Sequence, residues 1–360
     1  MVDINSLLTP PYSEGACSSG GGEVCVYKDP AGRFTIRPYQ AGDELRILDL
    51  FRRVFGVERS CEHWRWKFRD NPAGSYVLRV AETQDGRLVG QYALLPVRTR
   101  WGHETVTFIQ VIDVMVDPHY RMGLKRPGLF SVLAEQSVMA FLRGGLALIG
   151  YGFPTPEALR IGARAVGYHP LHPIQRLVKD LTVASRPRSF RPWSVRCERV
   201  ARFGDNVEML WRRCASSFDI AVIRDAEYLN WRYADCPDVA YTMVAAGQPW
   251  SGILSGAAVL RMGWADQPIA CLADWLVPPD ATSTAERLLA HCEALAREAG
   301  MERLSAWFPQ HAWPYRFLCE HGYRVEPTIY HLVALATDPM ADLERVRDRW
   351  YYTMGDSDIF

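Results

Sequence analysis

Apolar and polar residues alternate in some stretches of the chain and recur every three or four residues in others, which predicts strands and helices respectively. The segment FTIRPY at 34–39 predicts a strand. An amphipathic helix is expected from Asp43 to about Phe55. Strands are then expected at about 76–82, 87–101 and 105–117. The third contains VTFIQVIDVMV, which is nearly all apolar and should be central in the sheet.

The rest of the chain continues this alternation of helices and strands. The first half should end with a helix at about 129–142, a strand at 146–152, a helix at 156–166 and a strand within 172–183. The second half should contain strands near 195–203, 240–246, 252–262, 268–277, 303–308 and 329–336, and helices at 205–217, 283–299 and about 312–321. The aromatic-rich end, WYYTMGDSDIF, has no clear period. We expect it to be either a docked tail or a contact surface.

Three landmarks occur twice in the same order. The segment WRWKFRDNP at 64–72 recurs as LNWRYADCP at 229–237, and both should be short helices. A strand with an acidic residue follows in each half, at Asp113 and Asp274, and a Gly-Tyr pair comes later at 167–168 and 322–323. A repeat of 155–165 residues indicates two whole domains rather than a solenoid.

The repeat, the linker composition and the length of 360 residues suggest a domain layout. Prolines and serines between the copies indicate a linker, and the Ser- and Gly-rich start indicates a loose arm. The expected parts are an arm at 1–30, a first domain at 31–183, a linker at 184–193, a second domain at 194–336 and a tail at 337–360.

Composition narrows the class of protein. The chain has 41 basic and 41 acidic residues and no basic stripe, so a nucleic-acid partner is not expected. Nine scattered cysteines without a CxxC pair favour a reducing compartment. Neither a signal peptide nor an apolar run of membrane-spanning length is evident. We therefore expect a cytoplasmic protein without a membrane partner.

The element order, with VMVDPHYR leading into a Gly-containing loop and a helix, resembles the GNAT superfamily of acyl-CoA N-acyltransferases. The resemblance covers about 31–183, and the second half follows the same outline over about 194–336. It implies an α+β fold in which a mixed, mostly antiparallel sheet carries helices on both faces, in two tandem domains. It also implies acetyl-CoA or another acyl-CoA as co-substrate.

In that family, the loop after the fourth strand cradles the coenzyme A pyrophosphate. Free N–H groups and the positive end of the helix dipole favour phosphate there, and glycine allows close approach. The sequence differs from the family pattern, since Gly123 comes one residue early after Arg121. A register from Lys125 to Phe130 fits better, but it needs about four inserted residues and places Phe130 where the family has Gly or Ala. A basic loop that merely caps a helix is the alternative. The residues expected to bind the cofactor are Val114, Val116, Arg121, Lys125, Arg126, Gly128, Leu129 and Phe130.

The second half lacks such a loop. Its helix follows LVPPDATSTAERLL, which has two prolines and an aspartate where glycine and basic residues should be. We expect that this copy does not bind coenzyme A, and that it shapes the acceptor site or supports the first copy.

Three residues are candidates for the chemistry. Asp113, in a buried strand, could be a general base whose pKa burial raises toward neutrality. The alternative is a structural carboxylate where the strand bulges, which Asp274 in the second copy favours. The resemblance implies a Tyr one helical turn before the Gly-Tyr pair, which would protonate the departing thiolate. Ala163 stands at that position. Tyr151 or Tyr168 could replace it, although either could simply pack.

Two further patterns have simpler interpretations. The aromatic residues Trp64, Trp66 and Phe68 could line an acceptor groove, but core packing of a short helix is the commoner outcome. His169 and His172 have no acidic partners at metal-ligand spacing, so no metal site is expected.

The sequence thus favours an N-acyltransferase that moves an acyl group, most simply acetyl, from acyl-CoA to a small-molecule amine or amino sugar by direct attack. One alternative is a degenerate domain pair kept for binding or assembly. A transferase that takes aminoacyl groups from tRNA is less consistent with the neutral charge. The acceptor and the oligomeric state stay open.

Overall fold

The structure is a computed structural model that describes residues 18–20, 24–121, 128–143, 148–183, 195–248, 252–338 and 341–360. Contacts group the chain into two compact units. Unit 1 comprises residues up to 97, 107–171 and 331–343, and unit 2 comprises 98–106, 172–330 and 344–360. Each unit therefore takes segments from both halves of the sequence.

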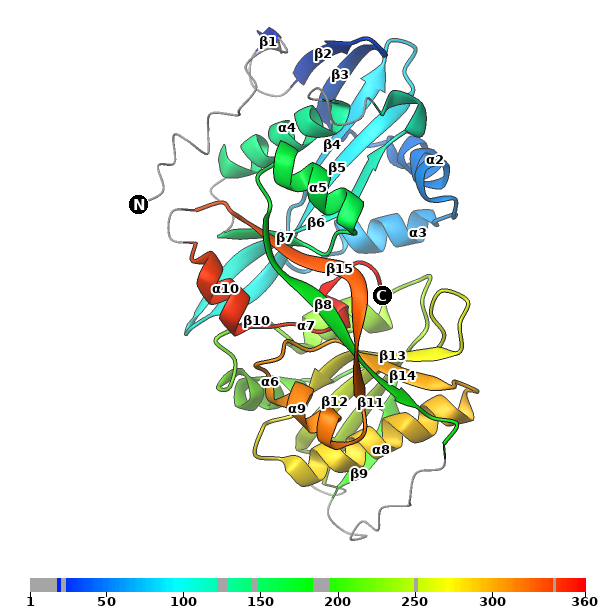
Figure 1. Ribbon diagram of the computed structural model, residues 1–360, viewed down its shortest axis with the longest axis vertical. Coiled ribbons are helices and arrows are strands. Elements are labelled where there is room, and N and C mark those ends of the chain that lie inside the picture. The colour runs from blue at the N-terminus through cyan, green and yellow to red at the C-terminus, as the bar shows by residue number, and fades with distance from the viewer. Residues whose placement is uncertain are drawn as a thin grey trace. The chain divides into compact units, whose positions relative to one another are not determined.

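Unit 1 is built on a mixed sheet with mostly antiparallel pairing (Figure 1). The strands in spatial order are β1 (Ser18–Gly20), β2 (Val24–Asp29), β3 (Gly32–Pro38), β4 (Val77–Thr83), β5 (Leu88–Trp101), β6 (Glu104–Val116), β7 (Ile149–Gly152) and β15 (Arg324–Ala336). The nearly all-apolar strand expected to be central is β6, which lies between β5 and β7 in this order. It pairs in parallel with β7.

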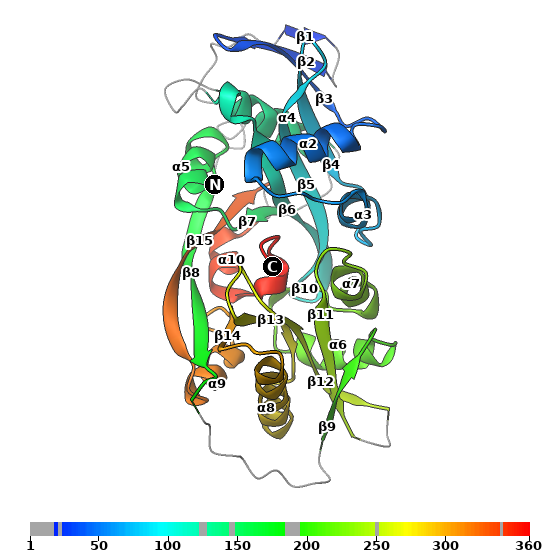
Figure 2. The ribbon, with the colours of Figure 1, turned by 90° about the vertical axis from the view of Figure 1, so that its right-hand side faces the viewer.

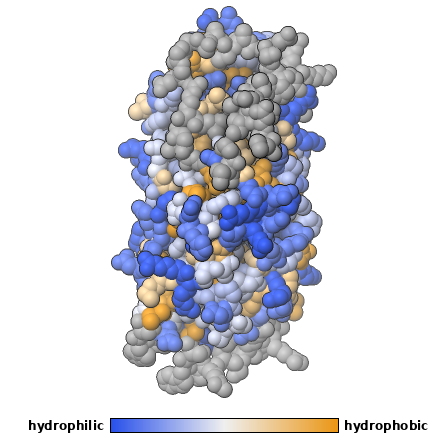
Figure 3. Space-filling model, turned by 90° about the vertical axis from the view of Figure 1, so that its left-hand side faces the viewer, coloured by the Kyte–Doolittle hydropathy of each residue, from blue (hydrophilic) through white to orange (hydrophobic). Residues whose placement is uncertain are grey.

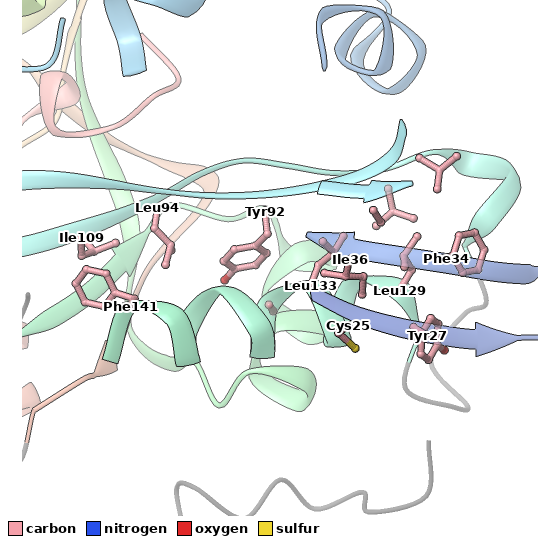
Figure 4. Close-up of a cluster of buried hydrophobic side chains, with 14 residues drawn as sticks. Cys25, Tyr27, Phe34, Ile36, Tyr92, Leu94, Ile109, Leu129, Leu133 and Phe141 are labelled. Carbon is pink, nitrogen blue, oxygen red and sulfur yellow. The ribbon is translucent and has the colours of Figure 1, made fainter. Parts of the chain in front are cut away.

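Helices flank both faces of this sheet, with α2 and α3 on one side and α4 and α5 on the other (Figure 2). They are α2 (Glu44–Phe55), α3 (Cys61–Trp64), the π-helical turn η1 (Arg65–Arg69), the 3-10 turn η2 (Pro118–Tyr120), α4 (Leu129–Arg143) and α5 (Pro156–Ala165). Leu129 and Leu133 of α4 enter an apolar cluster with Tyr92, Ile36 and Ile109 from the strands (Figure 4). This cluster attaches the start of α4 firmly to the sheet.

Unit 2 repeats the arrangement. Its sheet runs through β8 (His169–Asp180), β14 (Arg303–Ala306), β13 (Ile269–Leu276), β12 (Leu254–Arg261), β11 (Tyr241–Gly247) and β9 (Arg196–Val200). Off this path, β10 (Ile220–Val222) pairs with β16 (Trp350–Tyr351) and with the end of β5. Its helices are α6 (Asn206–Ala215), α7 (Ala226–Leu229), the π-helical turn η3 (Asn230–Ala234), α8 (Thr282–Glu298), α9 (Trp313–Glu320), α10 (Leu343–Arg349) and the 3-10 turn η4 (Met354–Asp356).

The last strand of each sequence half belongs to the sheet of the other half. The end of β15 pairs antiparallel with β7 in unit 1, with Ala334 opposite Tyr151. The end of β8 pairs antiparallel with β14 in unit 2, with Ser305 opposite Val178. The sequence layout placed both strands with their own halves, because periodicity shows that a strand exists and not which edge it joins.

At the ends of the chain, the structure revises the expectation for the N-terminal arm and bears out the docked-tail alternative for the C-terminal segment. Residues 24–29, expected within the loose arm, form β2, which pairs with β3 and buries Cys25 and Tyr27 in the core. Within the tail, residues 350–360 are docked in unit 2 and mostly buried. Aromatic side chains hold this segment without the regular spacing that a helix or strand would show.

Seven of the described cysteines are free thiols, whereas Cys25 is disulfide-bonded. The scattered cysteine pattern gave no sign of that bond. No helix in the described ranges is both long and apolar enough to span a bilayer. On the face drawn in Figure 3, hydrophilic residues predominate in the part that is coloured.

Candidate active site

The central strand of unit 1 bends at Asp113. Its φ of 46° lies in the left-handed region, which non-glycine residues rarely adopt and which Asp tolerates better than most. The apolar cluster receives Ile109 and Val111 before the bend and Val114 and Val116 after it. In a regular strand, residues three apart point to opposite faces. Val111 and Val114 both face the cluster because the strand is irregular between them.

Near the bend, β6 and β7 cease to pair. Their parallel register covers Phe108 to Gln110, opposite Ile149 to Tyr151. Beyond Gln110, β6 continues through the bend to Val116, whereas β7 ends at Gly152. The main chain around the bend therefore has no strand pairing with β7.

The Asp113 carboxylate is buried between two cations. Arg59 Nη1 lies 2.5 Å from its Oδ2, and Lys67 Nζ lies 3.4 Å from its Oδ1. The Arg59 guanidinium also stacks on the Phe51 ring, 3.8 Å from the centroid. Gln91 Nε2 donates to the main-chain oxygen of Asp113 at 3.0 Å. Both the side chain and the main chain of the bend are thus held.

These partners set the charge of Asp113. Burial alone would raise the pKa of the carboxyl, but the charges of Arg59 and Lys67 outweigh burial and hold the pKa well below its usual range. The expected upward shift is therefore wrong, because the sequence did not show the two cations. A carboxylate with a lowered pKa is a weak proton acceptor.

The same ion pair recurs in unit 2. Arg224 Nε donates to Asp274 Oδ1 at 2.8 Å, and Tyr233 donates to Oδ2 at 2.9 Å. Arg224 lies 165 residues after Arg59, which is the spacing of the two Trp-containing segments. The β12–β13 register also shifts beside Asp274. Sequence reasoning missed Arg59, although the repeat spacing could have identified it.

The Trp-containing segments are core elements. In each, one α-helical turn runs into a π-helical turn, at α3–η1 and α7–η3. Trp64, Trp66 and Phe68 are buried, with exposed fractions of 1%, 7% and 1%. The packing interpretation is confirmed. The π turn brings Lys67 of η1 to Asp113.

Of the two tyrosine candidates, Tyr168 has the more polar surroundings. Its hydroxyl is hydrogen-bonded to that of Tyr92, and desolvation raises its pKa to about 12. Its ring lies against Gly162, where a Cβ would approach ring atom Cδ2 to 2.3 Å. The ring of Tyr92 is 6.0 Å from that of Phe130, near the start of α4.

Tyr151 is only 1% exposed, and its ring packs near Phe108 and Phe153. The structure therefore places Tyr168 in contact with another hydroxyl and Tyr151 within an aromatic group.

The start of α4, expected to cradle phosphate, is described from Gly128 onward. Gly128 precedes the helix, and its main-chain oxygen accepts from Ser131 and Val132. Leu129 is buried in the core cluster, and Phe130 packs against it half-buried. Lys125 and Arg126 lie outside the described residues.

The other expected cofactor residues lie at the end of β6. Val114 is half-buried and Val116 is 9% exposed, both against the core cluster. Arg121 donates from Nε to the Val116 main-chain oxygen at 2.9 Å, so its guanidinium is held beside the strand end.

In unit 2, residues 350–360 of the chain itself occupy the region beyond the end of the β13–β14 pairing. This region corresponds to the point in unit 1 where β6 and β7 cease to pair. The β13–β14 pairing ends at Leu272 and Ala306. Beyond it, Tyr351 donates to the Trp275 main-chain oxygen at 2.7 Å, and the Phe360 ring lies 4.8 Å from that of Trp307. Figure 2 shows residues 350–360 beside β10 and β13.

Two buried arginines of unit 2, Arg224 and Arg232, hold residues 350–360 by hydrogen bonds. Arg224 Nη2 donates to Asp356 at 2.7 Å, and Arg232 Nη2 donates to the Phe360 main-chain oxygen at 2.6 Å. Arg232 occupies the repeat position of Lys67. The two copies thus use this position differently. Lys67 in unit 1 holds the strand bend at Asp113, whereas Arg232 in unit 2 holds residues 355–360.

Within the described part of the chain, no group of three His, Cys, Asp or Glu side chains is placed to hold a metal ion.

Comparisons with known proteins agree with this geometry. Residues 35–156 match the model of the acetyltransferase (GNAT) domain. No curated protein matches the sequence.

Three solved structures share the fold. A probable N-acyltransferase from Enterococcus faecalis has 15% identity and a TM-score of 0.62, over 85% of this chain and 72% of that one. A tandem GNAT protein from the clavulanic acid biosynthesis pathway has 17% identity and a TM-score of 0.55, over 85% and 99%. Saccharomyces cerevisiae N-myristoyltransferase, solved with myristoyl-CoA, has 12% identity and a TM-score of 0.56, over 87% and 83%.

The expected α+β fold with mostly antiparallel sheets is confirmed. Residues 35–156 thus match the GNAT acetyltransferase domain, and the chain shares its fold with solved GNAT structures, one of them a tandem GNAT protein.

Proposed function

We propose that unit 1 transfers an acyl group from acyl-CoA to an amine. The observation that carries this proposal is the start of α4, which follows β6 along the chain and is anchored by Leu129 in the core. Main-chain N–H groups in the first turn of a helix have no helical partner and attract phosphate. Gly128, Leu129 and Phe130, with Lys125 and Arg126, would hold the pyrophosphate.

The pantetheine arm would follow the end of β6, beside Val114 and Val116. The main chain of the bend would donate an N–H to the thioester carbonyl and stabilise the oxyanion as the amine attacks. An amine attacks a thioester without covalent catalysis, so positioning supplies much of the rate. Tyr168 is our candidate for protonating the departing thiolate as the C–S bond breaks, and its tyrosinate then takes up the proton that the acylated nitrogen loses.

We assign the second unit a supporting role. Its α8 begins at Thr282 after two prolines, and residues 350–360 fill the space beyond the β13–β14 pairing. We propose that acyl-CoA binds once per chain, in unit 1. The acceptor class that we favour is a small-molecule amine or amino sugar, with acetyl-CoA as the simplest donor, in the cytoplasm.

Titration calorimetry with coenzyme A tests the donor site. We expect one site per chain, and about tenfold weaker binding after the double change Lys125→Ala and Arg126→Ala, which corresponds to about 1.4 kcal/mol. The matched control is Arg287→Ala on α8, which should leave the affinity unchanged.

Two results would overturn the donor site. Loss of binding in the Arg287→Ala variant would place coenzyme A in unit 2. No heat at millimolar coenzyme A would favour the alternative of a degenerate pair kept for binding or assembly.

A further inference from the structure

The Arg59–Asp113 contact joins two parts of unit 1 that are far apart in sequence. Arg59 precedes α3, and Asp113 lies near the end of β6, three residues before Val116. Their side chains are 13% and 5% exposed, so the 2.5 Å contact is largely shielded from water. Removing one partner of such a pair leaves the other charge buried and uncompensated.

The bend at Asp113 requires support from its surroundings. A left-handed residue inside a strand is strained relative to the extended conformation, so it persists only where neighbouring groups hold it. Arg59 and Lys67 hold the carboxylate, and Gln91 holds the main-chain oxygen. Three contacts from outside β6 thus converge on one residue.

The second copy supports independently that the arginine–aspartate ion pair holds an irregular strand. Unit 2 also has an arginine and an aspartate in an ion pair, Arg224 and Asp274, and its β12–β13 register shifts beside Asp274. It keeps them although its helix start lacks the glycine and basic residues expected to bind phosphate. The ion pair therefore belongs to the architecture of the bent strand rather than to proton transfer.

We propose that Arg59 is a positioning residue: through its ion pair with Asp113, it holds the bend of β6 in the conformation that presents main-chain N–H groups to the thioester carbonyl. This inference rests on the proposed acyl transfer in unit 1. Asp113 is then the anchor of the bend, not the base, and the amine enters the site already deprotonated.

Infrared difference spectroscopy of bound acetyl-CoA, labelled with ¹³C at the thioester carbonyl, tests this inference without a known acceptor. A hydrogen bond from the bend lowers the stretching frequency of the carbonyl. We expect a downward shift in the wild type, and loss of most of it in Arg59→Gln and Asp113→Asn, with acetyl-CoA affinity within about threefold of the wild type. The matched control is Asp274→Asn, which should retain the shift.

Thiol release from acetyl-CoA with hydroxylamine as a generic nucleophile gives a second readout. We expect kcat to fall about tenfold to a hundredfold in Arg59→Gln, at nearly unchanged KM and with an unchanged pH profile. If single variants fail to fold, the double variant Arg59→Gln with Asp113→Asn removes both charges of the pair and should show the same loss.

The outcomes separate the two proposals. An unchanged carbonyl shift in the variants, or a pH profile that moves in Arg59→Gln, would overturn the positioning role alone. Failure of the wild type to bind acetyl-CoA would overturn the proposed function, and this inference with it.

Discussion

At the scale of single residues, the charge of Asp113 links stability to pH. Arg59 and Lys67 lower the pKa of this carboxyl below the value of about 3.9 that it has in the unfolded chain. A depressed pKa contributes stability that is fully present above the unfolded value and is lost as the pH falls through the folded value.

We therefore expect Asp113→Asn to lower the free energy of unfolding by about 3 kcal/mol at neutral pH, because it leaves the cations uncompensated. The difference from the wild type should stay constant down to about pH 5 and shrink below about pH 4. Urea titrations across this range measure it. A difference that widened toward acid pH would contradict the assignment.

The Tyr92–Tyr168 hydroxyl pair allows a second test. Tyr168→Phe should cost about 1–3 kcal/mol, because it removes a hydrogen-bonding partner from the buried Tyr92 hydroxyl. The double change with Tyr92→Phe should recover most of that loss, since neither hydroxyl then remains. Additive losses in thermal or urea unfolding would show that the hydroxyls do not depend on each other.

The same variants test Tyr168 as a proton donor to the thiolate. Loss of thiol release in Tyr168→Phe, together with normal activity in Tyr92→Phe, would support that role. Equal activity in the two variants would leave Tyr168 as a packing residue.

At the scale of elements, the 350–360 segment depends on Gly355. A Cβ there would come within 1.9 Å of the Tyr233 hydroxyl oxygen and 3.0 Å of the Ala273 main-chain oxygen. We expect Gly355→Ala to cost about 1–3 kcal/mol and to speed hydrogen exchange in 350–360.

The first copy supplies the compensating change, because Phe68 occupies the repeat position of Tyr233. Adding Tyr233→Phe to Gly355→Ala should restore part of the protection. If Gly355→Ala alone left the exchange of 350–360 unchanged, the segment would not be fixed in the way that we describe.

At the scale of the whole molecule, the exchanged strands make the two sequence halves interdependent. A fragment ending at residue 193 lacks the part of β15 that pairs with β7, and the remaining fragment lacks β8 beside β14. Each exposes an apolar sheet edge, which favours aggregation over folding.

We expect fragments 1–193 and 194–360 to show no cooperative unfolding when expressed separately, and to form a folded complex when expressed together. Near-ultraviolet circular dichroism and thermal melts measure this. A sharp melt of either fragment alone, with a native-like spectrum, would mean that the exchanged strand is dispensable.

Much of this molecule could be predicted from periodicity and repetition. The amphipathic spacing of 43–55 led to α2 at Glu44–Phe55, and the apolar run of 105–117 led to β6. The recurrence of the Trp-containing segment indicated two related folds, since each copy must bury the same apolar face. These features depend on local spacing and on self-similarity, and both are properties of the sequence.

Tertiary structure decided the rest. Asp113 meets Arg59 and Lys67 only when α3 and η1 pack on the sheet, so the direction of its pKa shift could not be derived from the strand alone. β8 and β15 exchange partners because strand pairing uses main-chain groups that every residue carries. The sequence determined which segments are strands, and long-range packing determined which strands meet.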